Sequence, residues 1–129
     1  MRFWLTDMGV IQIAGHDARA FLQGQLSNDM LRLTPEQSLL TALNTAQGRV
    51  VAVLRLMQHA DGIFAILPLT LVTKVIAALN KYVLRSKVAL SDESLRLAAV
   101  GVLDAGNRQS ILVPRTELTA LSPANALER

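Results

Sequence analysis

Two runs of alternating side chains, Leu39 to Ala46 and Val50 to Gln58, flank the dipeptide Gln47-Gly48. A connection this short leaves no room for a crossover, so the two runs must pair as an antiparallel hairpin. A two-residue loop predicts these cross-strand pairs: Ala46 with Arg49, Asn44 with Val51, Ala42 with Val53, and Leu40 with Arg55. The opposite face of the second strand is then apolar throughout and belongs to the core: Val50, Ala52, Leu54 and Leu56.

Apolar side chains at helical spacing predict two helices, over 17–27 and 69–85. Asp17 stands where a side chain caps the first helix. Gly24 and Gln25 are unusual inside that helix; we expect Gly24 to permit close packing on the sheet and Gln25 to brace a neighbouring backbone. The second helix is expected to bury Val72, Val75, Ile76, Leu79, Tyr82 and Val83.

Further strands are expected at 10–14, 63–67, 88–90, 95–103 and 111–113, with turns at Asp61-Gly62 and Ala105-Gly106-Asn107. The order β-α-β-β-β-α-β-β predicts an α+β fold, a mostly antiparallel sheet covered by two helices. Residues 1–113 are expected to form one domain, and residues 114–129 a poorly patterned tail.

The composition excludes several classes of protein. Of 129 residues, 51% are hydrophobic and 18% charged, which indicates a folded chain. No apolar run is long enough for a membrane span, and no cysteine is present to bind metal or form a disulfide. The net charge of +3 comes from scattered lysines and arginines, and only five residues are aromatic, so a dedicated nucleic-acid binder is not indicated. These features favour a cytoplasmic protein.

The hairpin carries the main candidate site. Its outer face is small and apolar in the middle, with Arg49 and Arg55 at its two ends. Such a face suits a flat ligand with an anionic tail, because arginine binds carboxylates in bidentate fashion. The alternative is that both arginines simply extend into solvent from a half-exposed sheet.

Other chemistry is weaker in the sequence. His16 and His59 each stand alone at a turn, which favours solvated histidines over metal ligands or acid–base groups. The adjacent Asp92-Glu93 does not form a catalytic carboxylate pair. Lys74, Lys81 and Arg85 are expected on a solvated helix face, with anion or RNA contact as the minority interpretation. The residues alone therefore give no complete active site.

Three ordered blocks resemble the YgfZ/GcvT folate-binding superfamily. The first is Gly15-His16-Asp17-Ala18 continued by Phe21-Leu22-Gln23-Gly24-Gln25-Leu26-Ser27-Asn28-Asp29. The second is Ala46-Gln47-Gly48-Arg49 with Leu54-Arg55-Leu56, and the third is Leu79-Asn80-Lys81-Tyr82-Val83-Leu84-Arg85-Ser86-Lys87-Val88. The blocks fit the YgfZ branch and span about residues 5 to 104.

The resemblance implies a role and a cofactor. Members are three-domain proteins that hold a tetrahydrofolate, and the YgfZ branch is associated with iron–sulfur cluster maintenance and tRNA modification. Expected partners are folate, the remaining domains of a longer chain and, through them, iron–sulfur proteins or tRNA. In the aminomethyltransferase branch an essential Asp stands at the position of Val53, so aminomethyl transfer is not expected. Two alternatives stay open: another folate-dependent one-carbon transferase, and a non-catalytic subunit or interaction module of the same fold.

The resemblance also implies ligand positions. Those that carry over are Met8, Leu40, Val53 and Arg55, and Arg49 is added from the hairpin pattern. The branch's Lys-Gly-Cys-Tyr-x-Gly-Gln-Glu signature is absent from this chain. We therefore expect the first domain of a longer protein, as a shortened chain or proteolytic fragment rather than a short homologue. The fragment alone is expected to bind folate weakly or not at all, without independent catalysis.

Overall fold

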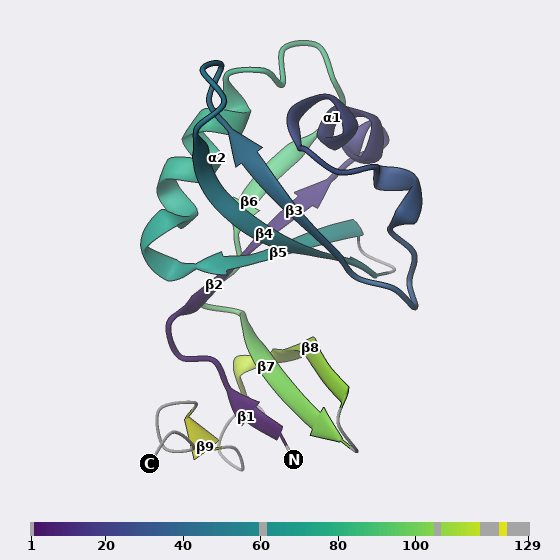
Figure 1. The fold of residues 1–129 in the computed structure, drawn as a ribbon. Helices are drawn as coiled ribbons and strands as arrows, with labels where there is room; N and C mark the ends of the chain where they lie inside the picture. Colours follow the sequence, from purple (N-terminus) through teal and green to yellow (C-terminus); the bar gives the residue numbers. More distant parts are fainter. Residues whose placement is uncertain (1, 60–61, 105–106, 117–121, 124–129) are drawn as a thin grey trace.

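The computed structural model describes residues 2–59, 62–104, 107–116 and 122–123. Its strands form two sheets, and two helices pack with the larger one (Figure 1). The α+β class and the predicted order are confirmed, from the strand at residue 8 through the strand that starts at Leu97. The prediction of one sheet was wrong, because the later strands form a sheet of their own.

The larger sheet has the strand order β3-β4-β5-β2-β6 and is antiparallel at every pair. Its strands are β2 (Met8–Ala14), β3 (Leu39–Asn44), β4 (Val50–His59), β5 (Gly62–Pro68) and β6 (Ala89–Asp92). One face carries the main core, which receives Phe21 and Leu22 from one helix and Val75 and Leu79 from the other. Val10, Phe64 and Ile66 point to the other face of the sheet, where they are buried outside that core.

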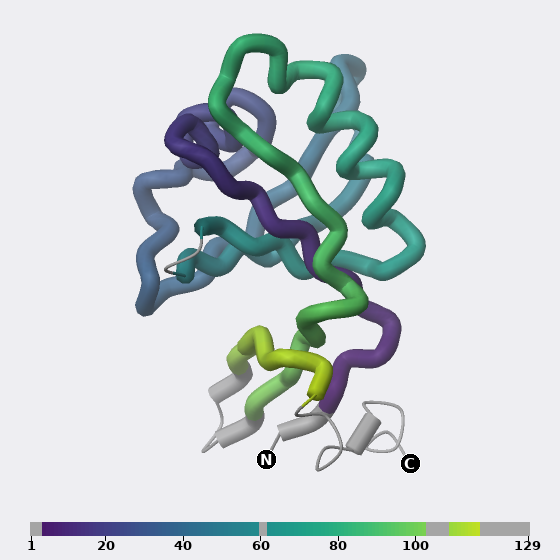
Figure 2. The backbone as a smooth tube through the Cα atoms, turned by 180° about the vertical axis from the view of Figure 1, so that it is seen from behind, coloured from purple at the N-terminus to yellow at the C-terminus, as the bar shows by residue number. Residues whose placement is uncertain are grey.

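The smaller sheet has the order β8-β7-β1-β9. Its strands are β1 (Arg2–Trp4), β7 (Leu97–Asp104), β8 (Asn107–Pro114) and β9 (Ser122–Pro123). Because β2 pairs with β6 and β1 pairs with β7, the N-terminal segment runs beside the later one through both sheets (Figure 2). Neither β1 nor β9 was predicted, since two or three residues show no alternation. The domain boundary at residue 113 stays a prediction.

Both helices are shorter than predicted. Helix α1 spans Ala18–Gln25, and α2 spans Val72–Asn80 after the 3₁₀ turn η2 (Leu69–Leu71); a second 3₁₀ turn, η1, spans Met30–Arg32. After Asn80 the backbone bonds reach back only three residues, as from Tyr82 N–H to the Leu79 carbonyl, and Leu84 takes φ +46°. Tyr82 is therefore 57% exposed, contrary to the predicted stripe, whereas Val83 packs against the core.

Three predictions about the first helix were wrong. The side chain of Asp17 does not cap α1; it accepts a hydrogen bond from Lys87 N–H instead. A Cβ added to Gly24 would meet no atom within 4 Å, so that glycine serves no close packing. Gln25 braces nothing among the described residues, although its neighbour Gln23 accepts a bond from Met30 N–H at 2.7 Å.

The hairpin has the predicted register in its middle and a different one at its tip. Leu40 faces Arg55 and Ala42 faces Val53, as expected. At the tip, Thr45 N–H bonds to the Arg49 carbonyl and Gly48 takes φ +85°, which gives a three-residue loop with a left-handed glycine. Asn44 consequently faces Val50 instead of Val51, and Val50 is 62% exposed rather than buried. The predicted turns at Asp61 and at Ala105-Gly106 fall on residues outside those described.

Candidate functional site

The outer face of the β3–β4 hairpin borders a shallow depression of about 470 Å³, hereafter the hairpin depression. All four positions that the family resemblance implied line it: Met8, Leu40, Val53 and Arg55. Met8 comes from the start of β2, and the other three come from the two hairpin strands. The depression therefore joins Met8 to Arg55, which lies 47 positions later in the chain.

The wall of the hairpin depression is largely apolar and open to solvent. Leu40 is 53% exposed and Val53 is 51% exposed, although each lies within a strand. Their neighbours Leu39, Leu54 and Leu56 point the other way into the core. Apolar side chains exposed together on one sheet face are typical of a ligand-binding or protein-binding surface.

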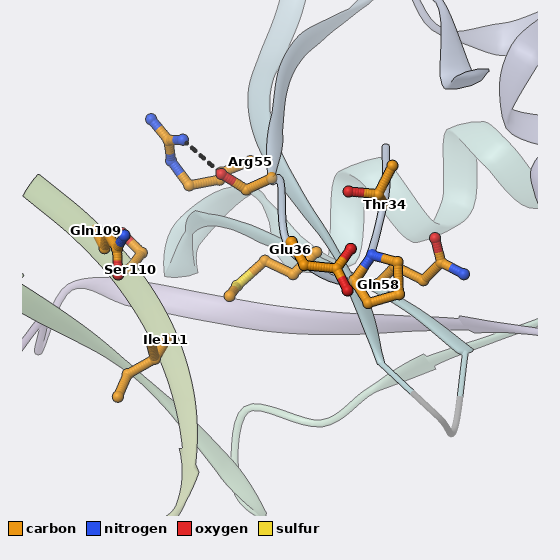
Figure 3. Close-up of a pocket in the computed structure, with 10 residues that line it drawn as sticks. Thr34, Glu36, Arg55, Gln58, Gln109, Ser110 and Ile111 are labelled. Carbon is orange, nitrogen blue, oxygen red and sulfur yellow. Dashed lines mark hydrogen bonds between the residues drawn. The ribbon is translucent and has the colours of Figure 1, made fainter. Parts of the chain in front are cut away.

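Arg55 is the charged residue of this depression, and its guanidinium has little to bind. Its Nη1 donates to the hydroxyl of Ser38 at 3.1 Å (Figure 3). Among the described residues the only ion pair joins Arg96 to Glu93, so Arg55 has no carboxylate partner there. A half-buried guanidinium with donors left over is suited to bind an anion.

A second, smaller cleft of about 210 Å³ adjoins the first at Arg55. Figure 3 shows its two sides: Thr34, Glu36 and Gln58 on one, and Gln109, Ser110 and Ile111 of β8 on the other. Ser110 also lines the hairpin depression, so both sheets contribute to the surface around Arg55. Alternation along β4 could not reveal Ser38 or Ser110, because both come from other segments.

Arg49 does not share this site. It lies in the hairpin loop with an exposed side chain and does not line the hairpin depression. The three-residue loop and the bulge after it displace this end of the hairpin from the register that had placed Arg49 and Arg55 at the two ends of one face. The structure thus brings four of the five predicted site residues together and separates the fifth.

The remaining candidates form no catalytic group. His16 and His59 are exposed, and no cluster of three or more potential metal-binding side chains occurs within the described ranges. Glu93 bonds to Arg96 at 2.7 Å, and this bond holds the pKa of its carboxyl below the ordinary value. In the part of the chain that the structure describes, no helix has the length and apolar character to cross a membrane.

Known proteins similar to this chain agree with the predicted family. The chain is 34% identical over 112 residues to the tRNA-modifying protein YgfZ of Edwardsiella ictaluri, a match that covers 86% of this chain and 34% of that protein. It is also 34% identical over 99 residues to the tRNA-modifying protein YgfZ of Escherichia coli O157:H7, covering 75% of this chain and 30% of the relative. Over most of its length, the chain is similar in sequence to YgfZ proteins. It spans about a third of the length of these curated relatives.

The fold has its own counterpart among solved structures. The glycine cleavage system aminomethyltransferase T of Bartonella henselae superposes with a TM-score of 0.67 at 20% identity, over 78% of this chain and 27% of the transferase. That likeness concerns the fold alone. No family model matches the chain. The YgfZ relationship and the GcvT-type fold therefore support the family that the three sequence blocks had implied.

Proposed function

We propose that this chain is the folate-contacting N-terminal part of a YgfZ-like accessory protein that acts in iron–sulfur cluster maintenance and tRNA modification. The observation that carries the proposal is the convergence of Met8, Leu40, Val53 and Arg55 on one depression. The similarity to relatives named as tRNA-modifying proteins supports the tRNA-modification part of the proposal.

The residues of the hairpin depression suit tetrahydrofolate. Met8, Leu40 and Val53 offer an apolar surface to its flat rings, and Arg55 offers charged donors to the carboxylates of its glutamate tail. When bound, the folate supplies a one-carbon carrier. This chain's own residues would bind and orient it.

None of the residues that line the hairpin depression carries a carboxylate or an imidazole that could supply an acid or a base for group transfer. The family resemblance implies that Val53 stands at the position where the aminomethyltransferase branch carries its carboxylate, and an apolar side chain neither accepts nor donates a proton. We therefore propose a binding and accessory role in preference to aminomethyl or other one-carbon transfer. Turnover of an aminomethyl donor by the longer protein would contradict this choice.

Isothermal titration of the longer YgfZ-like protein with 5-formyltetrahydrofolate tests the proposal. Replacing Arg55 by Gln removes the charge and most donors, and we expect folate affinity to fall about tenfold or more. Arg49→Gln is the matched control, because it removes the same charge from an exposed loop outside the depression. We expect it to leave affinity unchanged. Equal losses in both variants, or no binding heat at high micromolar folate, would contradict the proposal.

A second experiment concerns this chain alone. The hairpin depression is open on one side, so the 129 residues are expected to bind 5-formyltetrahydrofolate weakly or not at all. Titration of the isolated chain measures this directly. A micromolar dissociation constant would show that no further part of the protein is needed to hold the ligand.

A further inference from the structure

A third hollow lies at the tip of the β3–β4 hairpin, on the side that faces the helices. It has a volume of about 560 Å³, and its lining residues come from the end of α1, the β3–β4 hairpin and the end of α2. We call it the tip hollow and define it by Gly24, Gln25, Asn44, Thr45, Lys81 and Tyr82. Its size is that of a small-molecule site.

The side chains of the tip hollow form an unusual set. Tyr82 is 57% exposed and is held at the end of α2 by its N–H bond to the Leu79 carbonyl at 3.0 Å. The side-chain amides of Gln25 and Asn44 make no hydrogen bond within the described part of the chain, and Gln25 is half-buried. An exposed ring beside two unused amides offers a stacking surface and the groups that pair with base edges.

The charge around the tip hollow has one sign. None of the residues that line it is acidic, and Lys81 is among them. The backbone of Arg49 adjoins Thr45 through two hydrogen bonds. The Arg49 carbonyl accepts from Thr45 N–H at 2.7 Å, and Arg49 N–H donates to the Thr45 hydroxyl at 3.2 Å. The sequence between Gln37 and Ser91 has Asp61 as its only acidic residue, and of its six basic residues Lys81 lines the hollow and Arg49 adjoins it. The partner that complements this region is an anion.

We propose that the tip hollow binds single-stranded RNA, with one base stacked on Tyr82 and the flanking phosphates near Lys81 and Arg49. The amides of Gln25 and Asn44 would then pair with the edge of that base. Gly24 lines the hollow, and a Cβ added there would meet no atom within 4 Å, so a large side chain at this position would extend into open space at the hollow. This proposal extends the tRNA-modification part of the proposed function. It does not depend on folate, because Gly24, Lys81 and Tyr82 lie outside the hairpin depression.

Fluorescence anisotropy of a fluorescein-labelled single-stranded oligoadenylate, titrated with the full 129-residue chain, tests the proposal. We expect binding that weakens steeply as salt is raised, because phosphate contacts release counterions. Tyr82→Ala should weaken it about tenfold, whereas Tyr82→Phe should retain it, since stacking needs the ring and not the hydroxyl. Unchanged binding in Tyr82→Ala would overturn the stacked base.

Two more variants separate this site from general charge. Lys81→Gln should weaken binding more than Lys74→Gln, because both remove one exposed lysine but only Lys81 lines the hollow. Gly24→Leu should also weaken it by placing a large side chain at the hollow, while circular dichroism and folate titration of the longer protein stay unchanged. Equal effects of the two lysine variants would overturn the proposal in favour of diffuse attraction.

An acidic peptide is the competing occupant. A labelled oligoglutamate is expected to bind more weakly than the oligoadenylate and to be insensitive to Tyr82→Ala. Peptide binding that is as tight and equally sensitive would overturn the assignment to RNA. Loss of RNA binding with intact folate binding, or the reverse, would show which of the two proposals has failed.

Discussion

The carboxylate of Asp17 accepts a hydrogen bond from the backbone N–H of Lys87 at 2.8 Å, and Asp17 N–H donates to the Lys87 carbonyl at 3.2 Å. The two residues are 70 positions apart. They belong to the first and third of the sequence blocks that resemble the YgfZ/GcvT superfamily, and their two hydrogen bonds fix the start of α1 against the loop that follows α2.

Replacing Asp17 by Ala should lower the free energy of unfolding by about 1–2 kcal/mol, since the Lys87 N–H loses its acceptor. Asp17→Asn keeps an oxygen in the same place and should lose less. Urea denaturation followed by circular dichroism measures both. Equal stability of Asp17→Ala and the unmodified chain would show that the side-chain bond contributes nothing.

Arg19 connects three segments through one guanidinium. It donates to the carbonyls of Met30 and Leu33 and to Oε1 of Gln58, the last at 2.6 Å. Arg19→Met should therefore cost about 2–4 kcal/mol, because several acceptors lose a charged donor at once. Arg32→Met is the control: its side chain is exposed and makes no hydrogen bond among the described residues. Denaturation midpoints that shift equally in both variants would contradict this role of Arg19.

The middle of the hairpin could be predicted because strand alternation has a period of two and the core demands one apolar face. Leu54 and Leu56 are buried as that rule requires, and the Leu40–Arg55 pair follows from it. The tip could not be predicted, since loop length depends on the left-handed φ of Gly48, and a count of residues does not reveal that. Because the loop has three residues instead of two, Arg49 lies outside the predicted site.

The predicted end of the second helix was wrong for a different reason. Apolar residues continue at helical spacing through Tyr82 and Val83, but spacing does not say when the backbone bonds change from four residues to three. The division of the strands into two sheets could not be predicted from the sequence either, because one sheet includes β1, which is too short to show a pattern. The four pocket positions came from the family resemblance, and alternation alone singled out only the hairpin face.

Gly24 and Gly15 should respond in opposite directions to replacement by Ala. At Gly24 the new Cβ would meet nothing within 4 Å, so Gly24→Ala should stabilise the chain by about 0.5–1 kcal/mol through helix propensity. At Gly15, φ is +116° and the Cβ would lie 2.1 Å from the Lys87 carbonyl oxygen, so Gly15→Ala should be strongly destabilising. Thermal melting of the two variants gives the comparison. A loss of stability in Gly24→Ala would mean that this glycine has a packing role after all.

The Glu93–Arg96 pair predicts a dependence of stability on pH. The hydrogen bond from Arg96 lowers the pKa of the folded Glu93 carboxyl below 4.5, so the folded state favours the ionised form more than the unfolded state does. The contribution of the Glu93–Arg96 pair to stability is therefore complete above about pH 4.5 and is lost as pH falls through the lower, folded pKa.

Glu93→Gln should lower the melting temperature slightly at pH 7 and flatten its fall below pH 4.5, because the amide does not titrate. Arg96→Gln should flatten that fall less than Glu93→Gln does, since it removes the largest cause of the lowered pKa but leaves the hydrogen bond from the Ser91 hydroxyl to the Glu93 carboxyl. A melting curve of Glu93→Gln that remains parallel to that of the unmodified chain across this range would contradict the assignment.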